Sequence, residues 1–132
     1  MLDDLAQKYS ADRLLVFALD ITKSEEIVAA FARCKDVFGR IDVVVNNAGY
    51  GTLGEVEGQE ESTGRELMET NFWGNLRVTK EAVKFFRESN PPGVGGRLLQ
   101  MSSFLGIVGA PGVGFYAASK FGEPRLGHRA RI

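Results

Sequence analysis

Three short apolar runs, separated by helical patterns, limit what this chain can fold into. The runs cover residues 13–19, 41–45 and 97–103, and short continuous apolar runs are typical of strands covered on both faces. Between them, apolar residues recur at helical spacing over about 22–38 and 62–88. Alternating strands and helices predict an α/β fold with right-handed crossovers. We therefore expect a parallel sheet of three strands with flanking helices.

Both long helices carry signals of how they begin, end and pack. Thr22-Lys-Ser-Glu25 has the capping-box pattern, and Gly39 is a typical helix stop. In the second helix, Asn71-Phe-Trp-Gly74 is unfavourable, which indicates either a functional bend or slack in a well-packed helix. The residues expected to face the core are Ile27, Ala30, Phe31, Cys34 and Phe38 in the first helix, and Met68, Phe72, Leu76, Thr79, Val83 and Phe86 in the second.

Composition excludes several classes of function. With 132 residues, 44% of them hydrophobic and 25% charged, the chain has the makeup of one globular domain over 1–132. A net charge of −1 argues against a nucleic-acid partner, and no apolar run approaches the roughly 20 residues that span a membrane. Cys34 is the only cysteine, so we expect a cytoplasmic protein without an internal disulfide or a metal site. The one histidine, His128, leaves little room for a Ser-His-Asp mechanism.

Tyr116 and Lys120 predict an acid–base pair. Residues at i and i+4 on a helix share one face, about 6 Å apart along the axis. A lysine ammonium at that distance stabilises the phenolate of the tyrosine over the phenol, so that the phenol can give or take a proton. Ser103, at the end of the third apolar run, can hold a substrate oxygen meanwhile. By itself, however, a tyrosine and a lysine at this spacing are more often an ordinary helix surface pair.

A turn sequence, Asn46-Asn47-Ala48-Gly49, directly follows the second apolar run. Turn residues at the carboxyl end of a parallel strand lie where open α/β sheets bind ligands. Asn and Gly also tolerate left-handed backbone, so a plain strand-to-loop turn explains the same residues. Residues 50–60 are expected to form a loop.

Together, these signals resemble the short-chain dehydrogenase/reductase family, whose members move hydride between a nicotinamide cofactor and a carbonyl or alcohol. The match is carried by Asn46-Asn47-Ala48-Gly49, Asn71-x-x-Gly74, Ser103 and Tyr116-x-x-x-Lys120. The resemblance implies a partial Rossmann-like, doubly wound parallel sheet. It also implies NAD or NADP as the cofactor and a small-molecule carbonyl or alcohol as the substrate. Homo-oligomers would form through the helices at 62–88 and 115–121.

The resemblance implies a role for each matching residue. Tyr116 would be the general acid/base, and Lys120 would stabilise its phenolate and bind the nicotinamide ribose. Ser103 would hold the substrate oxygen, and Asn71 would anchor a water in the proton relay. Asp20 would contact the adenine ring. The cofactor trough would be lined by Asn46, Ala48 and Gly49.

The resemblance covers only the middle of the family's fold. The family's first two strands and glycine-rich phosphate loop, which hold the pyrophosphate, are not among these residues. The strand at 13–19 would lack its neighbour, and a divergent tail over 122–132 places Pro124 where it interrupts the helix below Lys120. We therefore expect these 132 residues alone to bind nucleotide weakly and not to oxidise NADPH. Two functions stay open: an oxidoreductase of this family, or an inactive truncated or regulatory chain that acts at most by helix-mediated association with a full-length relative.

Overall fold

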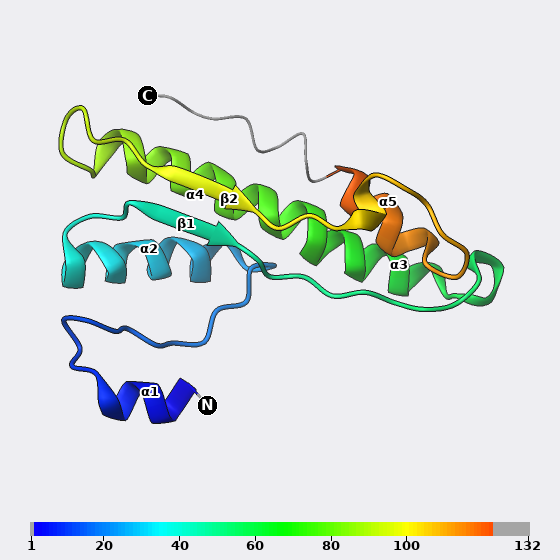
Figure 1. The fold of residues 1–132 in the computed structure, drawn as a ribbon, viewed down its shortest axis with the longest axis horizontal. Coiled ribbons are helices and arrows are strands. Elements are labelled where there is room, and N and C mark those ends of the chain that lie inside the picture. The colour runs from blue at the N-terminus through cyan, green and yellow to red at the C-terminus, as the bar shows by residue number, and fades with distance from the viewer. Residues whose placement is uncertain (1, 123–132) are drawn as a thin grey trace.

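The computed structural model describes residues 2–122, which form a small parallel sheet with helices packed on it (Figure 1). Within this part of the chain, none of the helices combines the length and the apolarity that a membrane crossing requires. The elements, in chain order, are α1 (Leu2–Lys8), α2 (Ser24–Phe38), β1 (Val43–Asn46), the short helical turn η1 (Val56–Gly58), α3 (Glu61–Met68), the π-helical segment η2 (Glu69–Gly74), α4 (Asn75–Glu88), β2 (Arg97–Gln100), the turn η3 (Phe104–Gly106) and α5 (Gly114–Gly122).

β1 and β2 run parallel, as the alternation of apolar runs and helical patterns predicts. Val43 lies opposite Arg97, and Asn46 lies opposite Gln100. The pairing continues past the strands, because the Met101 N–H donates to the Asn46 carbonyl oxygen at 3.0 Å. Both strands therefore end at the same edge of the sheet, and the loops that follow them leave from this edge (Figure 1).

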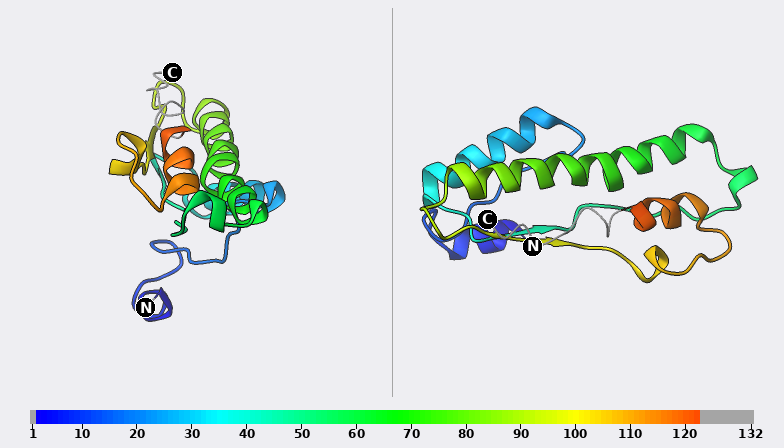
Figure 2. Two further views of the ribbon diagram at one scale, coloured as in Figure 1. Left: turned by 90° about the vertical axis from the view of Figure 1, so that its right-hand side faces the viewer. Right: turned by 90° about the horizontal axis from the view of Figure 1, so that it is seen from above.

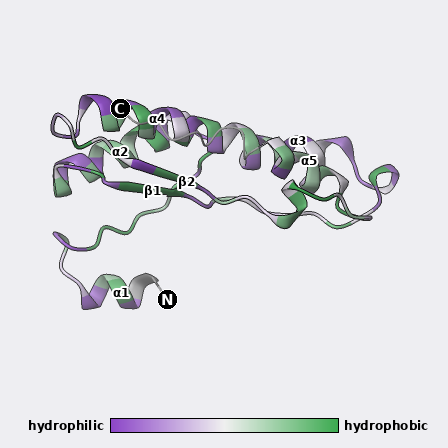
Figure 3. Cartoon of the chain, turned by 45° about the horizontal axis from the view of Figure 1, so that its top comes forward, coloured by the Kyte–Doolittle hydropathy of each residue, from purple (hydrophilic) through white to green (hydrophobic). Residues whose placement is uncertain are grey.

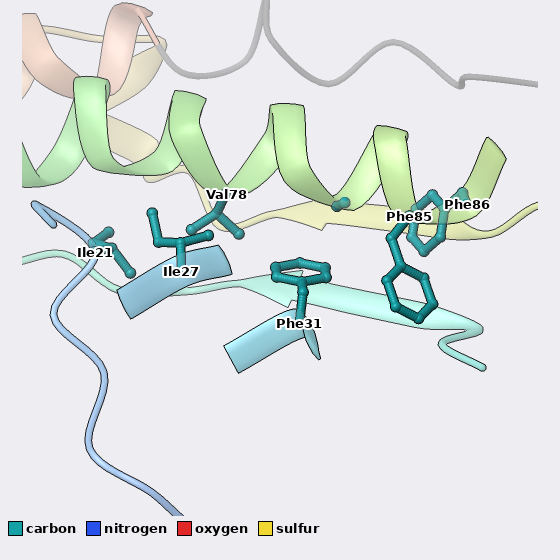
Figure 4. Close-up of a cluster of buried hydrophobic side chains, with 7 residues drawn as sticks. Ile21, Ile27, Phe31, Val78, Phe85 and Phe86 are labelled. Carbon is teal, nitrogen blue, oxygen red and sulfur yellow. The ribbon is translucent and has the colours of Figure 1, made fainter. Parts of the chain in front are cut away.

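α2 and α4 cover one face of the sheet (Figure 2). Val44 and Leu98 pack from the strands against the core between these helices, where the rings of Phe31 and Phe85 lie 5.9 Å apart (Figure 4). The buried cluster consists of Ile21, Ile27, Phe31, Val78, Ala82, Phe85 and Phe86. β1 consists of three valines followed by Asn46 (Figure 3), yet Val45 on the other face of the sheet is 56% exposed. The apolar runs predicted strands covered on both faces, but within the described residues the face of the sheet that carries Val45 is left exposed.

The strand expected at 13–19 is absent, so the prediction of a third strand is wrong. Residues 14–20 run without regular structure, and the sheet in the described residues consists of β1 and β2 only. An isolated strand leaves its backbone N–H and C=O groups without a ladder partner, which is costly unless water reaches them. Ile21, directly after this segment, is 6% exposed and joins the core.

α2 begins one residue later than the capping-box pattern predicts, and the predicted capping box does not form. Its first residue is Ser24, and the preceding Lys23 makes no side-chain cap. The chain instead turns at Asp20, whose carboxylate accepts from the Thr22 N–H at 2.9 Å, while Glu26 accepts from the Asp20 N–H at 2.7 Å. The predicted end is confirmed, because Gly39 has φ 72° and its N–H donates to the Lys35 carbonyl oxygen at 2.8 Å.

The long helix predicted over 62–88 is confirmed as α3, η2 and α4 in succession. Of its predicted core face, Phe86 is buried as predicted, whereas the other five residues, among them Leu76 and Thr79, are only half-buried. In the first helix, Phe38 is 38% exposed and Cys34 is half-buried, so the stripe is shorter than predicted. The buried residues of the long helix are instead Gly64, Leu67, Asn71, Gly74, Asn75, Val78, Ala82, Phe85 and Phe86.

The helix predicted to carry Tyr116 and Lys120 is confirmed as α5, which ends at Gly122. The rest of the predicted divergent tail, with Pro124 and His128, lies outside the described residues.

Candidate active site

α5 places Tyr116 and Lys120 one turn apart at the carboxyl edge of the sheet. The Lys120 Nζ lies 5.8 Å from the centroid of the Tyr116 ring and donates to the Met101 carbonyl oxygen, just after β2, at 3.0 Å. Lys120 is only 5% exposed. A buried ammonium is costly unless it is paired or hydrogen-bonded, so these contacts fix its place. Because Lys120 is buried, Tyr116 and Lys120 are not an exposed pair on the helix surface.

The Tyr116 ring is held beside the loop that follows β1. A Cβ added to Gly51 would lie 3.4 Å from Cδ2 of the ring, so the backbone at Gly51 runs along one side of it. The Gly54 N–H donates to the Gly112 carbonyl oxygen at 2.9 Å, which joins this loop to the segment that leads into α5. The loop after β1 thus lies along one side of the Tyr116 ring and is hydrogen-bonded to the segment that precedes α5.

Asn71 lies in η2 and is 0% exposed. Its Oδ1 accepts from the Tyr50 N–H at 3.0 Å, and its Nδ2 donates to the Tyr50 carbonyl oxygen at 2.8 Å and to Ser119 Oγ at 3.0 Å. The unfavourable sequence at 71–74 therefore corresponds to a π-helical turn, a feature that is frequent at functional sites. The structure brings Asn71 to α5 through Ser119.

Asn46 and Asn75 extend this hydrogen-bonded network one helical turn further. Asn46 Nδ2 donates to the Asn75 carbonyl oxygen at 2.9 Å. Asn75 Nδ2 donates to the Ala48 carbonyl oxygen at 3.1 Å and to the Asn71 carbonyl oxygen at 2.7 Å. Side-chain amides therefore fix the backbone of the turn at 46–50 against the long helix.

Gly49 lies between two of the predicted site residues. A Cβ added here would lie 3.0 Å from Asn71 Oδ1 and 3.6 Å from Lys120 Nζ. The φ of Gly49 is outside the left-handed region, and no non-glycine residue of the described chain has a positive φ. Close approach to Asn71 and Lys120, rather than a left-handed turn, therefore explains the glycine.

Ser103 lies beyond β2, at the start of η3. Its Oγ accepts from the Leu105 N–H at 3.2 Å, so it caps this turn. η3 in turn packs closely on α5, since a Cβ added to Gly106 would lie 2.6 Å from the Lys120 carbonyl oxygen. The capping bond uses a lone pair of the serine oxygen, whereas donation to a substrate oxygen uses the hydroxyl proton.

Asp20 lies further along the same edge, at a shallow groove of about 590 Å³ that Tyr50 and Thr70 also line. The Thr22 hydroxyl and the Thr22 N–H donate to the Asp20 carboxylate at 2.7 and 2.9 Å and hold the pKa of that carboxyl below its usual value. Because Tyr50 also hydrogen-bonds Asn71, the groove adjoins the network around Tyr116.

Sequence reasoning missed two polar residues in this network, Asn75 and Ser119. Both are buried, at 2% and 0% exposure. Their spacing was the available signal: Asn75 is four residues after Asn71, and Ser119 is three residues after Tyr116, so each shares a helix face with a predicted site residue.

The residues present fit the nicotinamide end of a dinucleotide. Gly49 and Gly51 carry no side chain where one would reach Lys120 or the Tyr116 ring. The Lys120 ammonium and the Tyr116 phenol lie at the carboxyl edge of the parallel sheet, where such folds bind nucleotides, and both can hydrogen-bond the hydroxyl groups of a ribose. The ionised Asp20 offers acceptors for an amino group further along this edge.

A comparison with known protein families assigns the chain to one of them. The family model described as short chain dehydrogenase matches residues 1–130, so the chain belongs to the short-chain dehydrogenase family. An uncharacterized oxidoreductase from Schizosaccharomyces pombe is 44% identical over 109 residues, which make up 83% of this chain and 36% of the relative. The chain thus spans about a third of the length of the curated relatives it matches.

Solved structures show the same fold. A short-chain dehydrogenase from Streptomyces avermitilis superposes with a TM-score of 0.79 at 35% identity, over 92% of this chain and 43% of that one. ElxO with NADP bound superposes with a TM-score of 0.79 at 25% identity, over 92% of this chain and 47% of that one. The predicted partial Rossmann-like α/β fold is therefore confirmed, with two strands in place of three among residues 2–122.

Proposed function

We propose that this chain carries the acid–base centre of an NAD(P)-dependent oxidoreductase that moves hydride between a nicotinamide cofactor and a carbonyl or alcohol. The observation that carries the proposal is the buried Lys120 ammonium beside the Tyr116 ring, at the carboxyl edge of the parallel sheet. A positioned phenol can exchange a proton with the oxygen of an alcohol or carbonyl, and the fixed ammonium beside it is available to attract the charge that develops during that transfer.

Each residue of the site has a part in this proposal. Tyr116 donates a proton to the carbonyl oxygen in reduction and takes it back in oxidation. Lys120 stabilises the phenolate and donates to the nicotinamide ribose. The Ser103 hydroxyl donates to the substrate oxygen and orients it, and Asn71 holds a water of the proton relay.

The cofactor, when bound, supplies or accepts the hydride, and the protein supplies position and the proton. The residues that hold it in this proposal are Asn46, Ala48 and Gly49 along the turn after β1, Tyr116 and Lys120 at the ribose, and Asp20 at the adenine. Binding of NADP by ElxO, a relative of the same fold, supports NADP or NAD as the group that fits.

An apolar rim at the same edge favours a lipophilic carbonyl or alcohol as the substrate. Three large apolar side chains of the loops after β1 and β2 face solvent: Leu53 is 87% exposed, Phe104 71% and Ile107 74%. Exposed apolar side chains next to a binding site gain by covering an apolar ligand.

A chimera tests the proposed function. In the Streptomyces avermitilis short-chain dehydrogenase, the segment that matches this chain is replaced by this chain's own residues. Oxidation of NADPH or NADH is then followed by absorbance with a series of uncharged ketones and aldehydes. We expect turnover that falls by about 10²–10⁴-fold in Tyr116→Phe, the usual contribution of general acid catalysis.

The matched control is Tyr9→Phe, which removes the same hydroxyl from a tyrosine that is 39% exposed on the surface. It should leave turnover unchanged. A folded chimera that binds nucleotide but turns over equally fast with and without the Tyr116 hydroxyl would refute the role of Tyr116. These 132 residues alone are expected not to turn over, and activity of the isolated chain that Tyr116→Phe abolishes would contradict this expectation.

A second candidate function is association without catalysis, as a homo-oligomer or with a full-length relative. The observation in its favour is that Trp73, on the long helix, and Phe121, on α5, are 48% and 47% exposed. Large apolar side chains on two adjacent helices are typical of interfaces. Light scattering of the purified chain, with Trp73→Arg as the variant, tests this candidate; a monomer in the wild type would exclude self-association.

A further inference from the structure

We propose that Ser119 is a positioning residue that connects Asn71 to Tyr116. The proposal rests on the proposed function, since it assigns Ser119 to the same site. Ser119 is 0% exposed. Its hydroxyl donates to the Tyr116 carbonyl oxygen at 2.7 Å and accepts from Asn71 Nδ2 at 3.0 Å.

A serine on a helix often bonds back to the carbonyl three or four residues earlier, with no role beyond its own helix. Ser119 differs because of its second bond, which comes from another element 48 residues away. The hydroxyl has one proton, and that proton goes to the Tyr116 carbonyl oxygen, so the serine oxygen faces Asn71 as an acceptor.

The direction of these bonds fixes the Asn71 carboxamide. Its Oδ1 must face the Tyr50 N–H, which can only donate, and its two Nδ2 protons go to the Tyr50 carbonyl oxygen and to Ser119 Oγ. A rotated amide would place its oxygen against the Tyr50 carbonyl oxygen. The ordered chain of hydrogen bonds runs from Tyr50 through Asn71 and Ser119 to Tyr116.

The hydrogen bonds from Tyr50 to Tyr116 hold the Tyr116 backbone, and the contact at Gly51 holds the Tyr116 ring. Ser119 fixes the Tyr116 backbone in the first turn of α5, and Gly51, next to Tyr50, lies against its ring. Without the serine hydroxyl, α5 loses its bond to Asn71 and, through Asn71, its link to Tyr50 in the loop after β1. By holding the Tyr116 backbone, the Ser119 hydrogen bond helps to set where the phenol oxygen lies. That position matters because a displacement of about 1 Å can slow a reaction about 10²-fold.

The first test uses NMR on the 15N-labelled 132-residue chain and needs no cofactor. In Ser119→Ala we expect the Asn71 side-chain proton that faces Ser119 to exchange with water about tenfold faster, while the proton on the Tyr50 carbonyl oxygen keeps its protection. The nuclear Overhauser contact between the Tyr116 ring and the Gly51 α-protons should weaken in the same variant. Ser62→Ala, which removes an exposed serine hydroxyl from α3, is the matched control.

The second test measures kinetics in the chimera described above. Ser119→Ala should lower kcat about tenfold with little change in the KM of the carbonyl substrate, because the serine touches neither ligand in this proposal. Ser119→Cys keeps the size of the side chain and offers a weaker donor and acceptor, so its kcat should lie between those of wild type and Ser119→Ala. It also serves if Ser119→Ala does not fold.

The outcomes separate this proposal from the proposed function. A Tyr116–Gly51 contact that is equally strong in wild type and Ser119→Ala would overturn the positioning role, whatever the kinetics. Faster amide exchange with unchanged kcat would reduce Ser119 to a structural residue and also overturn it. A wild-type chimera without turnover would instead refute the proposed function, and the NMR contact would still decide whether Ser119 positions Tyr116.

Discussion

Replacing Asn71 with alanine removes a carboxamide that is 0% exposed and makes three hydrogen bonds. Each such bond contributes about 1 kcal/mol net, so their loss costs about 3 kcal/mol, and stranded partners add to this cost. Alanine has a higher helix propensity than asparagine, which offsets roughly 0.5 kcal/mol. Tyr50 is 44% exposed, so water can replace the lost partners in part. We expect Asn71→Ala to lower the free energy of unfolding by about 2–4 kcal/mol.

Urea unfolding followed by circular dichroism measures this effect. With a denaturant dependence of about 2 kcal/mol per molar urea, within the usual range for small proteins, the midpoint should fall by about 1–2 M. Asn47→Ala is the matched control, because Asn47 belongs to the same turn but is exposed. It should change the free energy of unfolding by less than about 0.5 kcal/mol. If both variants shift the midpoint equally, the Asn71 amide does not hold the loop to the helix, and the reasoning fails.

Two further predictions concern close approach and pH. Gly49→Ala puts a Cβ 3.0 Å from Asn71 Oδ1, so it should lower the free energy of unfolding by about 1–2 kcal/mol. In the control, Gly58→Ala, the added Cβ meets nothing within 4 Å, so the free energy of unfolding should fall by less than about 0.5 kcal/mol. Equal thermal midpoints in the two variants would contradict the crowding at Gly49. The pKa of Asp20 is lowered from 3.8, first by the Thr22 hydroxyl, so the folded chain binds this proton less tightly than the unfolded chain. The stabilisation is therefore present above pH 3.8 and is lost as the pH falls through the folded-state pKa. Asp20→Asn should lower the urea midpoint at neutral pH but not in strong acid, and a difference that is the same at both would refute this assignment.

Local patterns predicted the helices and the two strands that pair, because helical periodicity and apolar runs depend on neighbouring residues alone. The run at 13–19 has the same character as the one at 41–45, yet only the second becomes part of a strand. The difference is not local: a strand needs a neighbour for its backbone groups, and β1 pairs with β2, more than 50 residues along the chain. An apolar run by itself does not specify that neighbour.

Residue types and spacing predicted Tyr116, Lys120 and Ser103, and the family resemblance implied the other site residues. The side chains that support them, Asn75 and Ser119, were not predicted. The expected core face of the long helix followed apolar residues, whereas the face that is buried carries Asn71 and Asn75. Asn71 is buried at low cost because its carboxamide bonds the backbone of Tyr50 at both its oxygen and its nitrogen, and the Asn75 Nδ2 donates to the Ala48 carbonyl oxygen. Those partners lie on a loop that sequence alone did not place, so hydrophobicity pointed to the wrong face.

Buried polar groups of this kind tie the stability of the fold to the chemistry of the site, and two variants separate the contributions. Asn71→Ala alters the packing of the loop and the helix together, so it should lower both the free energy of unfolding and the turnover of an active chimera. Tyr116→Phe removes one oxygen atom from a half-buried ring, so it should lower turnover by about 10²–10⁴-fold and change the free energy of unfolding by less than about 1 kcal/mol. A Tyr116→Phe chimera as unstable as Asn71→Ala would mean that the tyrosine hydroxyl holds the fold, and the acid–base assignment would lose its main support.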